Sequence, residues 1–372
     1  MDENSGPDPR DTVLPPTGTR IEAPKLPYQP RDPRRYRPQI GLIACGGITK
    51  DHLTAYRKAG YQVTAMADPV LHRARKRKTE FYPEARVCGD YRDLLKRDDV
   101  EVVDIAAHPQ ERAPIIEAAL LAGKHVLSQK PFVLDLDFGG RMVELADRRG
   151  LKLAVNQNGR WAPHFSYIRQ AIGAGLLGQV TAAHLSVHWD HNYLKGTPFE
   201  KVKHLILYDF GIHWFDILTC FLDYSAIRRV YASTARSPVQ QVRPALLAQA
   251  LVEYDGAQAS LVFDADTRFG PQDHTYVTGS RGTIVSTGPD LKHQTVTLYT
   301  PQGWARPELQ GCWFPDGFRG TMGELLSAIE EDREPLNSGR NNLQSLALCF
   351  AAAASAERHE PVVPGTVRTM SP

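Results

Sequence analysis

The sequence predicts an α/β protein whose N-terminal domain has a parallel sheet and whose C-terminal α+β domain has a large, mostly antiparallel open sheet. Over residues 39–157, short apolar runs alternate with helical stretches, as in consecutive βαβ units. From residue 158 to the end, several strand-like runs follow one another without helices between them, which is typical of antiparallel pairing. The length of 372 residues suits two domains better than a single core.

Residues 1–38 differ in composition from everything after them. They contain nine of the 27 prolines, among alternating charges and isolated apolar residues such as Leu26 and Tyr28. Such a segment cannot build a core and should run extended. Two interpretations stay open: a disordered tail, or an arm that lies across a neighbouring subunit and uses the apolar residues as anchors.

The domain at residues 39–157 is predicted from five apolar runs and four helical stretches. Gly60, Gly123 and Gly150 come just after three of the helices, where a helix C-terminus favours glycine. The expected strands are residues 40–44, 63–67, 102–106, 125–127 and 153–155, and the expected helices are residues 50–59, 71–81, 112–122 and 136–149.

The domain at residues 158–372 should contain more strands than helices, with the strands grouped in sequence. The expected strands are residues 180–189, 229–234, 246–254, 257–263, 275–278 and 295–299, and the expected helices are residues 162–174, 209–222, 318–330 and 342–358.

The composition excludes several classes of partner. With 44 basic and 42 acidic residues, the chain has no electrostatic reason to bind nucleic acid or an anionic membrane. It has no apolar run near the roughly 20 residues that span a bilayer, and no export signal at its N-terminus. The five cysteines are scattered and form neither a zinc motif nor a disulfide framework. We therefore expect a soluble, cytoplasmic protein without a metal.

A glycine turn, Ala44-Cys45-Gly46-Gly47-Ile48-Thr49, follows the first strand and opens a helix. Glycines there let a pyrophosphate approach the N–H groups at the helix N-terminus, where the dipole favours anions. Ala44 and Thr49 occupy the first and third glycine positions of the usual G-x-G-x-x-G, so the turn alone is a weak indication.

Asp68 strengthens this interpretation, because it ends the second strand 22 residues beyond Gly46. An acid there can accept both adenosine ribose hydroxyls and repel a 2′-phosphate. It can also be a helix cap before Pro69, and the two roles are compatible. The pattern predicts a Rossmann dinucleotide-binding domain that prefers NAD to NADP, although Arg73 and Arg77 nearby could compensate a 2′-phosphate.

The turn Gln129-Lys130-Pro131 follows the fifth strand, at the carboxyl edge where open α/β sheets bind ligands. A lysine there can hold its ammonium against a substrate oxygen and stabilise a developing alkoxide. The alternative is an ordinary surface lysine before a proline turn.

Asp209, His213 and Asp216 are spaced to share one face of the predicted helix over residues 209–222. A neutral imidazole can take a hydroxyl proton while a hydride leaves the same carbon. A carboxylate within reach can orient that imidazole or bind a second hydroxyl. Alternatively, Asp209 is a helix N-cap and His213 a hydrogen-bonded core residue.

The stretch from residue 190 to 207 is long, polar and mixed with Tyr193 and Phe199. Long irregular loops are often functional, so this one is a candidate for substrate recognition together with Trp313 and Phe314, unless these side chains simply pack. Four histidines surround it, but His184, Ser186 and His188 alternate as on one face of a strand, so we expect no metal site. The four are His184, His188, His191 and His204.

These stretches together resemble the Gfo/Idh/MocA family of sugar and cyclitol dehydrogenases, over about residues 39–358. The pairing of a Lys-Pro turn with an Asp-x-x-x-His helix is specific to that family. The matching stretches are Gly41 to His52, Ala65 to Pro69, Gly123-Lys124-His125-Val126, Gln129-Lys130-Pro131, Arg160-Trp161-Ala162-Pro163, Gly175-Leu176-Leu177-Gly178 and Asp209 to Asp216.

The resemblance implies a dehydrogenase of a secondary hydroxyl in a sugar, cyclitol or glycoside, with NAD more than NADP as cofactor and a homo-oligomer, dimer or tetramer, as the assembly. It implies that Lys130 binds the reacting hydroxyl, that His213 is the acid/base, and that Asp209 binds substrate or tunes His213. The cofactor contacts it implies are Gly46, Gly47, Ile48, Asp68, Ala107, His108, Gln129, Lys130, Arg160 and Trp161, and the substrate contacts are Lys130, Asn158, Asp209 and His213.

Three departures from the family pattern concern the cofactor contacts. Gln129 replaces the usual glutamate, so Lys130 loses a neighbouring negative charge and should hold its proton less firmly. His108-Pro109 replaces Thr-Pro, and Ala113 replaces a common histidine. Two further functions stay open: cleavage or elimination of a glycoside assisted by NAD without net redox, and a non-catalytic nucleotide-binding regulator. The presence of Lys130, Asp209 and His213 together argues against the regulator.

Overall fold

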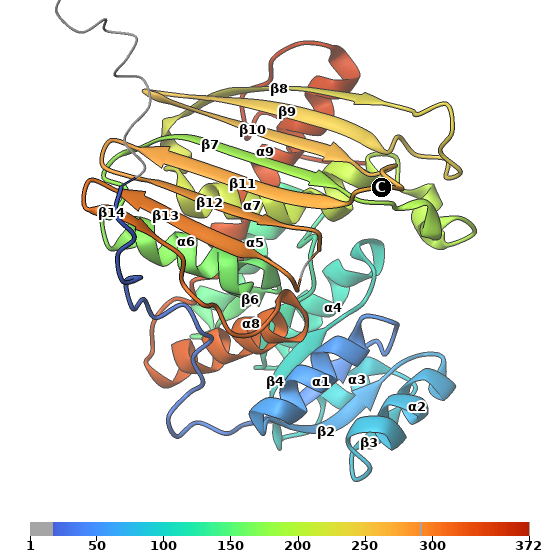
Figure 1. Cartoon of the computed structure of the whole chain (residues 1–372). Coiled ribbons are helices and arrows are strands. Elements are labelled where there is room, and N and C mark those ends of the chain that lie inside the picture. The colour runs from blue at the N-terminus through green and yellow to red at the C-terminus, as the bar shows by residue number, and fades with distance from the viewer. Residues whose placement is uncertain (1–17, 291, 372) are drawn as a thin grey trace, which may run out of the picture.

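A six-stranded parallel sheet forms the N-terminal domain (Figure 1). The computed structural model describes residues 18–290 and 292–371. The strand order is β3-β2-β1-β4-β5-β6, so the chain reverses direction across the sheet between β1 and β4, where open α/β sheets form a ligand crevice. The strands are β1 (Gln39–Ile43), β2 (Gln62–Ala67), β3 (Arg86–Cys88), β4 (Val100–Ile105), β5 (His125–Ser128) and β6 (Leu153–Val155).

The helices of this domain connect successive parallel strands. They are α1 (Thr49–Ala59), α2 (Leu71–Phe81), α3 (Tyr91–Leu95), α4 (Pro109–Leu121) and α5 (Leu136–Arg148). All five predicted strands and four predicted helices are confirmed, and Gly60, Gly123 and Gly150 each adopt a positive φ at a helix end. The sequence missed β3 and α3, because a three-residue edge strand without a buried side chain has no apolar run to reveal it.

An eight-stranded sheet forms the core of the C-terminal domain, in the order β14-β13-β12-β11-β7-β10-β9-β8. Every neighbouring pair is antiparallel except β7 and β10, which confirms the predicted mostly antiparallel sheet. The strands are β7 (Val180–His188), β8 (Ile227–Ala235), β9 (Leu247–Tyr254), β10 (Ala257–Asp264), β11 (Gln272–Gly279), β12 (Thr283–Gly288), β13 (Thr295–Thr300) and β14 (Gly303–Ala305).

Helices cover one face of this sheet, and the other face stays open (Figure 1). Along β9, buried and exposed side chains alternate strictly, as expected for a sheet with one solvated face. The helices of this domain are α6 (Pro163–Gly173), α7 (Ile212–Phe221), α8 (Trp313–Glu330) and α9 (Gly339–Arg358).

The helix predicted over residues 209–222 is split in two. A π-helical turn, η5 (Leu205–Phe210), precedes α7. Gly211 joins them so tightly that a Cβ there would lie 2.7 Å from the Ile206 carbonyl oxygen. Asp209 therefore lies in the π-helical turn, whereas His213 and Asp216 lie on α7.

Residues 18–38 lie along their own chain and touch both domains. Tyr167 donates a hydrogen bond to the Pro24 carbonyl at 2.9 Å, and Tyr61 donates one to Asp32 at 2.5 Å. The Glu330 carboxylate accepts hydrogen bonds from three successive backbone N–H groups at residues 34–36. The disordered-tail interpretation is therefore wrong for residues 18–38, because side chains of the folded domains satisfy the extended backbone. Residues 1–17 lie outside the described part.

Candidate active site

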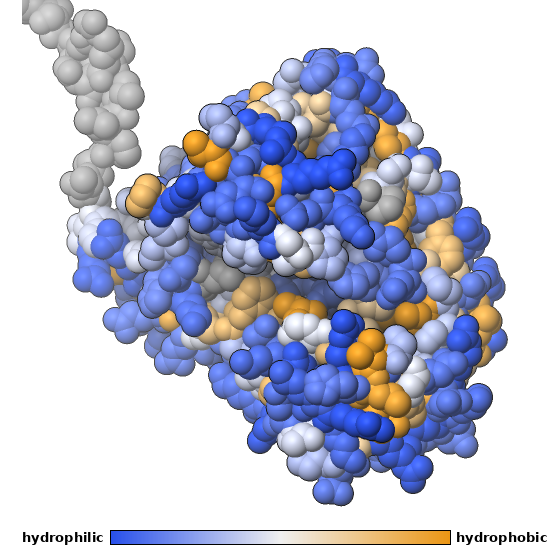
Figure 2. Space-filling model, turned by 90° about the vertical axis from the view of Figure 1, so that its right-hand side faces the viewer, coloured by the Kyte–Doolittle hydropathy of each residue, from blue (hydrophilic) through white to orange (hydrophobic). Residues whose placement is uncertain are grey.

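A cavity of about 670 Å³ opens at the carboxyl edge of the parallel sheet, between the two domains. The face in Figure 2 shows a hollow between an upper and a lower lobe, with hydrophobic side chains inside it. Most of the predicted site residues line the cavity, and they come from strand ends far apart in the sequence. These lining residues are Ile48, Ala107, His108, Gln129, Lys130, Asn158, Asp209 and His213.

Lys130 connects the two domains inside this cavity. Its Nζ donates a hydrogen bond to the Asp209 carbonyl oxygen at 2.7 Å and lies 3.4 Å from Asp209 Oδ2. Both side chains are more than four-fifths buried. Asp209 therefore supplies, beside Lys130, the negative charge that Gln129 lacks.

Arg112 holds the turn that carries Lys130. Its guanidinium is buried and donates to the Ala107 carbonyl oxygen at 2.6 and 3.1 Å and to the Pro131 carbonyl oxygen. Burial lowers the pKa of Arg112 to about 10, which leaves the group charged at neutral pH. The guanidinium of Arg112 thus connects the segment after β4 to the segment after β5.

Gln129 belongs to a buried hydrogen-bond chain behind Lys130. Its Oε1 accepts from the Lys130 backbone N–H at 2.7 Å, and its Nε2 lies 3.1 Å from His52 Nε2. His52 Nδ1 lies 2.7 Å from Asp104 Oδ2, so this nitrogen is the donor. With its proton on Nδ1, His52 donates to Asp104, and its Nε2 accepts from the Gln129 amide. Glutamine at position 129 therefore supplies a donor that the usual glutamate carboxylate would lack.

His213 presents a neutral imidazole to the cavity. Only 8% of it is exposed, and no group in the described residues hydrogen-bonds its Nδ1. Burial, and secondarily the positive charge of Lys130, hold its pKa well below the usual value. The edge of the Trp313 ring lies against it, with the ring centroids 5.4 Å apart. His213 can therefore accept a proton from a hydroxyl bound at Lys130.

The glycine turn leaves space that the fold itself does not use. Neither Gly46 nor Gly47 has a left-handed φ, and a Cβ at either position would meet no atom within 4 Å. Glycine is therefore not required there by the backbone, and its absence of a side chain leaves room for a ligand at the N-terminus of α1. Ala44, in contrast, has a φ of +66°, which usually favours glycine.

Asp68 fixes this turn. Its carboxylate accepts hydrogen bonds from the backbone N–H groups of Cys45 and Val70, both at 2.8 Å. It is not the helix cap that the sequence allowed, because the N-cap position of α2 is Val70. Arg77 donates to the Gly46 carbonyl oxygen at 3.0 Å and to Glu80 at 2.7 Å. Arg77 is therefore already paired, which weakens the compensation that it could offer a 2′-phosphate.

Arg160 and Trp161 lie outside the cavity, contrary to the predicted nicotinamide contact. Arg160 forms a bidentate ion pair with Asp216, with N–O distances of 2.6 and 2.7 Å, and Ser345 donates to the same carboxylate at 2.7 Å. Trp161 packs against Gly320 of α8, where no Cβ would fit. Both side chains are directed into the interior, and Asp216 stabilises the fold there instead of touching a ligand.

The four histidines around residue 190 bind separate partners. His184 lies 2.7 Å from Ser260 Oγ, His188 lies 2.9 Å from Asp264, and His204 lies 2.8 Å from Glu357. His191 packs among aromatic rings instead. Within the described ranges, no three histidine, cysteine or acidic side chains gather as a metal site. No helix in these ranges is long and apolar enough to cross a bilayer.

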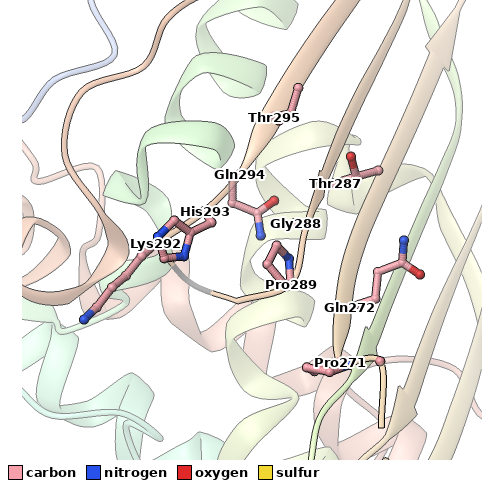
Figure 3. A pocket seen from close by; sticks show the side chains of 10 residues that line it. Pro271, Gln272, Thr287, Gly288, Pro289, Lys292, His293, Gln294 and Thr295 are labelled. Carbon is pink, nitrogen blue, oxygen red and sulfur yellow. The ribbon is translucent and has the colours of Figure 1, made fainter.

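A second, shallow cavity of about 610 Å³ adjoins the first at the ends of β11 and β12 (Figure 3). Pro271 and Pro289 border both cavities. Gln272 and Gln294 give it a polar lining, while the Lys292 side chain extends away from them.

The sequence did not reveal Arg112 or the His52–Asp104 pair. One indication existed: Asp104 is an acid inside an otherwise apolar run, which requires a buried partner. The loop after β7, the predicted candidate for substrate recognition, contributes Tyr193 and Phe199 to the cavity lining, and Trp313 and Phe314 line it as well.

Comparison with known proteins identifies the family. A profile described as an oxidoreductase family with an NAD-binding Rossmann fold matches residues 39–157, and one described as the GFO/IDH/MocA C-terminal domain matches residues 165–285. The chain belongs to the Gfo/Idh/MocA oxidoreductase family. The predicted resemblance, fold class and enzyme class are thereby confirmed.

Curated relatives of the chain are dehydrogenases. It is 28% identical over 350 residues to D-apiose dehydrogenase of Paraburkholderia graminis, covering 86% of this chain and 88% of the relative. It is 25% identical over 327 residues to inositol 2-dehydrogenase of Rhizobium meliloti, covering 85% and 96%. An oxidoreductase from Agrobacterium radiobacter, solved with NAD⁺, L-tartaric acid and magnesium, shares the fold with a TM-score of 0.80 at 22% identity, covering 89% and 99%.

Proposed function

We propose that this oxidoreductase moves a hydride between NAD and a secondary carbinol of a sugar, cyclitol or glycoside. The observation that carries the proposal is one cavity that joins the Lys130–Asp209 pair to a neutral His213 with a free nitrogen, at the carboxyl edge of the dinucleotide domain. Two relatives are named for such substrates, apiose and inositol.

The glycine turn and Asp68 fit a dinucleotide. The space over Gly46 and Gly47 would take the pyrophosphate, and the Asp68 carboxylate would bind the adenosine ribose. This acid and the paired state of Arg77 favour NAD over NADP. When bound, the nicotinamide supplies the hydride acceptor.

Within the cavity, Lys130 and His213 divide the proton chemistry. The Lys130 ammonium donates a hydrogen bond to the reacting hydroxyl oxygen and stabilises the negative charge that grows on it. His213 accepts the hydroxyl proton, which its neutral state permits. Asp209 holds the ammonium in place and offers a carboxylate to a second hydroxyl.

The test is formation of NADH, followed at its absorbance, across a panel of sugars, inositols and glycosides. We expect turnover with at least one of them and its loss in Lys130→Ala and in His213→Ala. Normal turnover in either variant would defeat the assigned roles. Product formed from a glycoside without net NADH would defeat the dehydrogenase reaction itself.

We also propose that a second copy of the chain covers the open face of the large sheet. Four large side chains on this face are exposed although they are apolar or aromatic: Tyr231, Leu251, Tyr276 and Tyr299. Light scattering should give the mass of a dimer or tetramer, and Leu251→Arg should reduce it. A monomer mass for the unaltered chain would contradict this proposal.

A further inference from the structure

The cavity has two chemically different walls. One wall comes from the dinucleotide domain and consists of aliphatic or polar groups after β1, β4 and β5, among them Ile48, Ala107 and Gln129. The opposite wall comes from the C-terminal domain and is aromatic. Its members are Trp189, His191, Tyr193, Phe199, Phe210, Trp214, Trp313 and Phe314, and Lys130, Asp209 and His213 lie where the two walls meet.

The aromatic rings of this wall contact one another as a continuous surface. Trp189 and His191 are stacked with centroids 6.2 Å apart, and Phe210 and His191 are nearly perpendicular with centroids 4.3 Å apart. Trp214 lies 5.8 Å from Trp189 and 5.5 Å from Trp313. Burial lowers the pKa of His191 to about 4, so this ring is neutral and contributes no charge.

The aromatic wall reaches the mouth of the cavity on the loop after β7. Tyr193 there is 67% exposed. The loop is fixed beside it, because Asn192 donates to Asp190 at 2.7 Å and to Asp266 at 2.6 Å. Phe199 farther along lies against His108 of the other domain, with centroids 6.5 Å apart. Tyr193 therefore leaves an aromatic ring uncovered at the mouth of the cavity.

The charges of the lining exclude an anionic substituent. Its cations are Lys130, paired with Asp209, and Arg112, bonded to backbone carbonyl oxygens. Asp190 and Asp290 also line the cavity. A phosphate or a nucleotide would thus find acids and no unpaired lysine or arginine in the described lining, and a free polyol would leave hydroxyls unpaired against the rings.

We propose that the substrate is a neutral glycoside with a flat, apolar aglycone, whose sugar ring binds at Lys130 and whose aglycone lies on the aromatic wall. This inference rests on the proposed dehydrogenase function and specifies its substrate class. Aromatic faces bind both the C–H face of a sugar and an aryl group.

The test compares matched phenyl and methyl β-D-glycopyranosides of glucose, galactose and xylose, with the free sugars and myo-inositol beside them. For the sugar that is oxidised, kcat/KM of the phenyl glycoside should exceed that of the methyl glycoside at least about 30-fold, which corresponds to about 2 kcal/mol. Binding is measured separately by quenching of tryptophan fluorescence with 4-nitrophenyl glycosides, since Trp189, Trp214 and Trp313 belong to the wall.

Variants of Tyr193 test whether the aromatic wall causes the preference for phenyl over methyl glycosides. Tyr193→Ala should reduce the phenyl-to-methyl ratio at least about 5-fold, and Tyr193→Phe should keep it. Phe269→Ala is the matched control, because this ring is 91% exposed and does not line the cavity. Its ratio should equal that of the unaltered enzyme.

The outcomes separate this inference from the proposed function. NADH formation with equal kcat/KM for phenyl and methyl glycosides, or with free sugars preferred, overturns the inference and leaves the dehydrogenase standing. A phenyl preference that Tyr193→Ala and Phe199→Ala both leave intact also overturns it. Tight binding of aryl glycosides without any NADH formation supports the aromatic wall and overturns the dehydrogenase.

Discussion

The ion pair of Arg160 and Asp216 should make Asp216→Asn a stability variant and not a catalytic one. Arg160 is 4% exposed and Asp216 1%, and the two side chains share a bidentate contact. Removing one partner of a buried pair typically costs about 3–5 kcal/mol, because the other charge stays buried without compensation. Asparagine keeps the shape and one acceptor, so we expect the lower end, about 3 kcal/mol.

The assay is urea unfolding followed by tryptophan fluorescence, with kcat measured below the unfolding transition. Asp209→Asn is the matched control, since Asp209 lies in the cavity beside Lys130. Asp216→Asn should lose about 3 kcal/mol of unfolding free energy and keep kcat within about threefold. Asp209→Asn should keep its unfolding free energy and lose kcat. An Asp216→Asn variant with full stability and abolished turnover would refute the structural role.

Three further variants test the glycine turn, the hydrogen bond between Gln129 and His52, and the buried imidazole of His164. Gly46→Ala should change stability by less than about 0.5 kcal/mol, because the added Cβ meets no protein atom. It should raise the Kd for NAD at least tenfold, because this Cβ enters the space proposed for the pyrophosphate; equal NAD affinity would contradict this. Gln129→Glu should lose about 1–3 kcal/mol of unfolding free energy, because its carboxylate cannot donate to His52 Nε2; an unchanged free energy in urea unfolding would exclude this hydrogen bond. Burial lowers the pKa of His164 to about 3, so only the unfolded chain takes up its proton as the pH falls below about 6.5, and the folded state loses stability. Between pH 6.5 and 4.5 the unaltered protein should therefore lose about 2 kcal/mol more than His164→Leu, and equal losses would contradict the burial effect.

The sequence predicted those features that follow from apolar periodicity and from the positions where strands end. The glycine turn, Asp68 and Lys130 follow the parallel strands β1, β2 and β5, and the carboxyl ends of these strands lie at one edge of the sheet. Their convergence on one region was therefore predictable without knowing any side-chain direction.

Side-chain direction and long-range pairing were not predictable from local sequence. Arg160 and Trp161 occupy the expected segment, but their side chains point to Asp216 and α8. The spacing of Asp209, His213 and Asp216 assumed one regular helix, but a π-helical turn ends at Phe210, and only Asp209 and His213 line the cavity. The path of residues 18–38 depends on Glu330, almost 300 positions away, and nothing in the proline-rich composition indicates that partner.

The central claim is that the ammonium of Lys130 stabilises charge on the reacting hydroxyl. Lys130→Met tests it most directly, because methionine keeps an unbranched side chain and removes the charge. With NAD saturating and the oxidised substrate in hand, kcat/KM should fall at least about 100-fold, the loss typical of one removed donor at a developing oxyanion. A kcat/KM within about threefold of the unaltered enzyme would contradict the account.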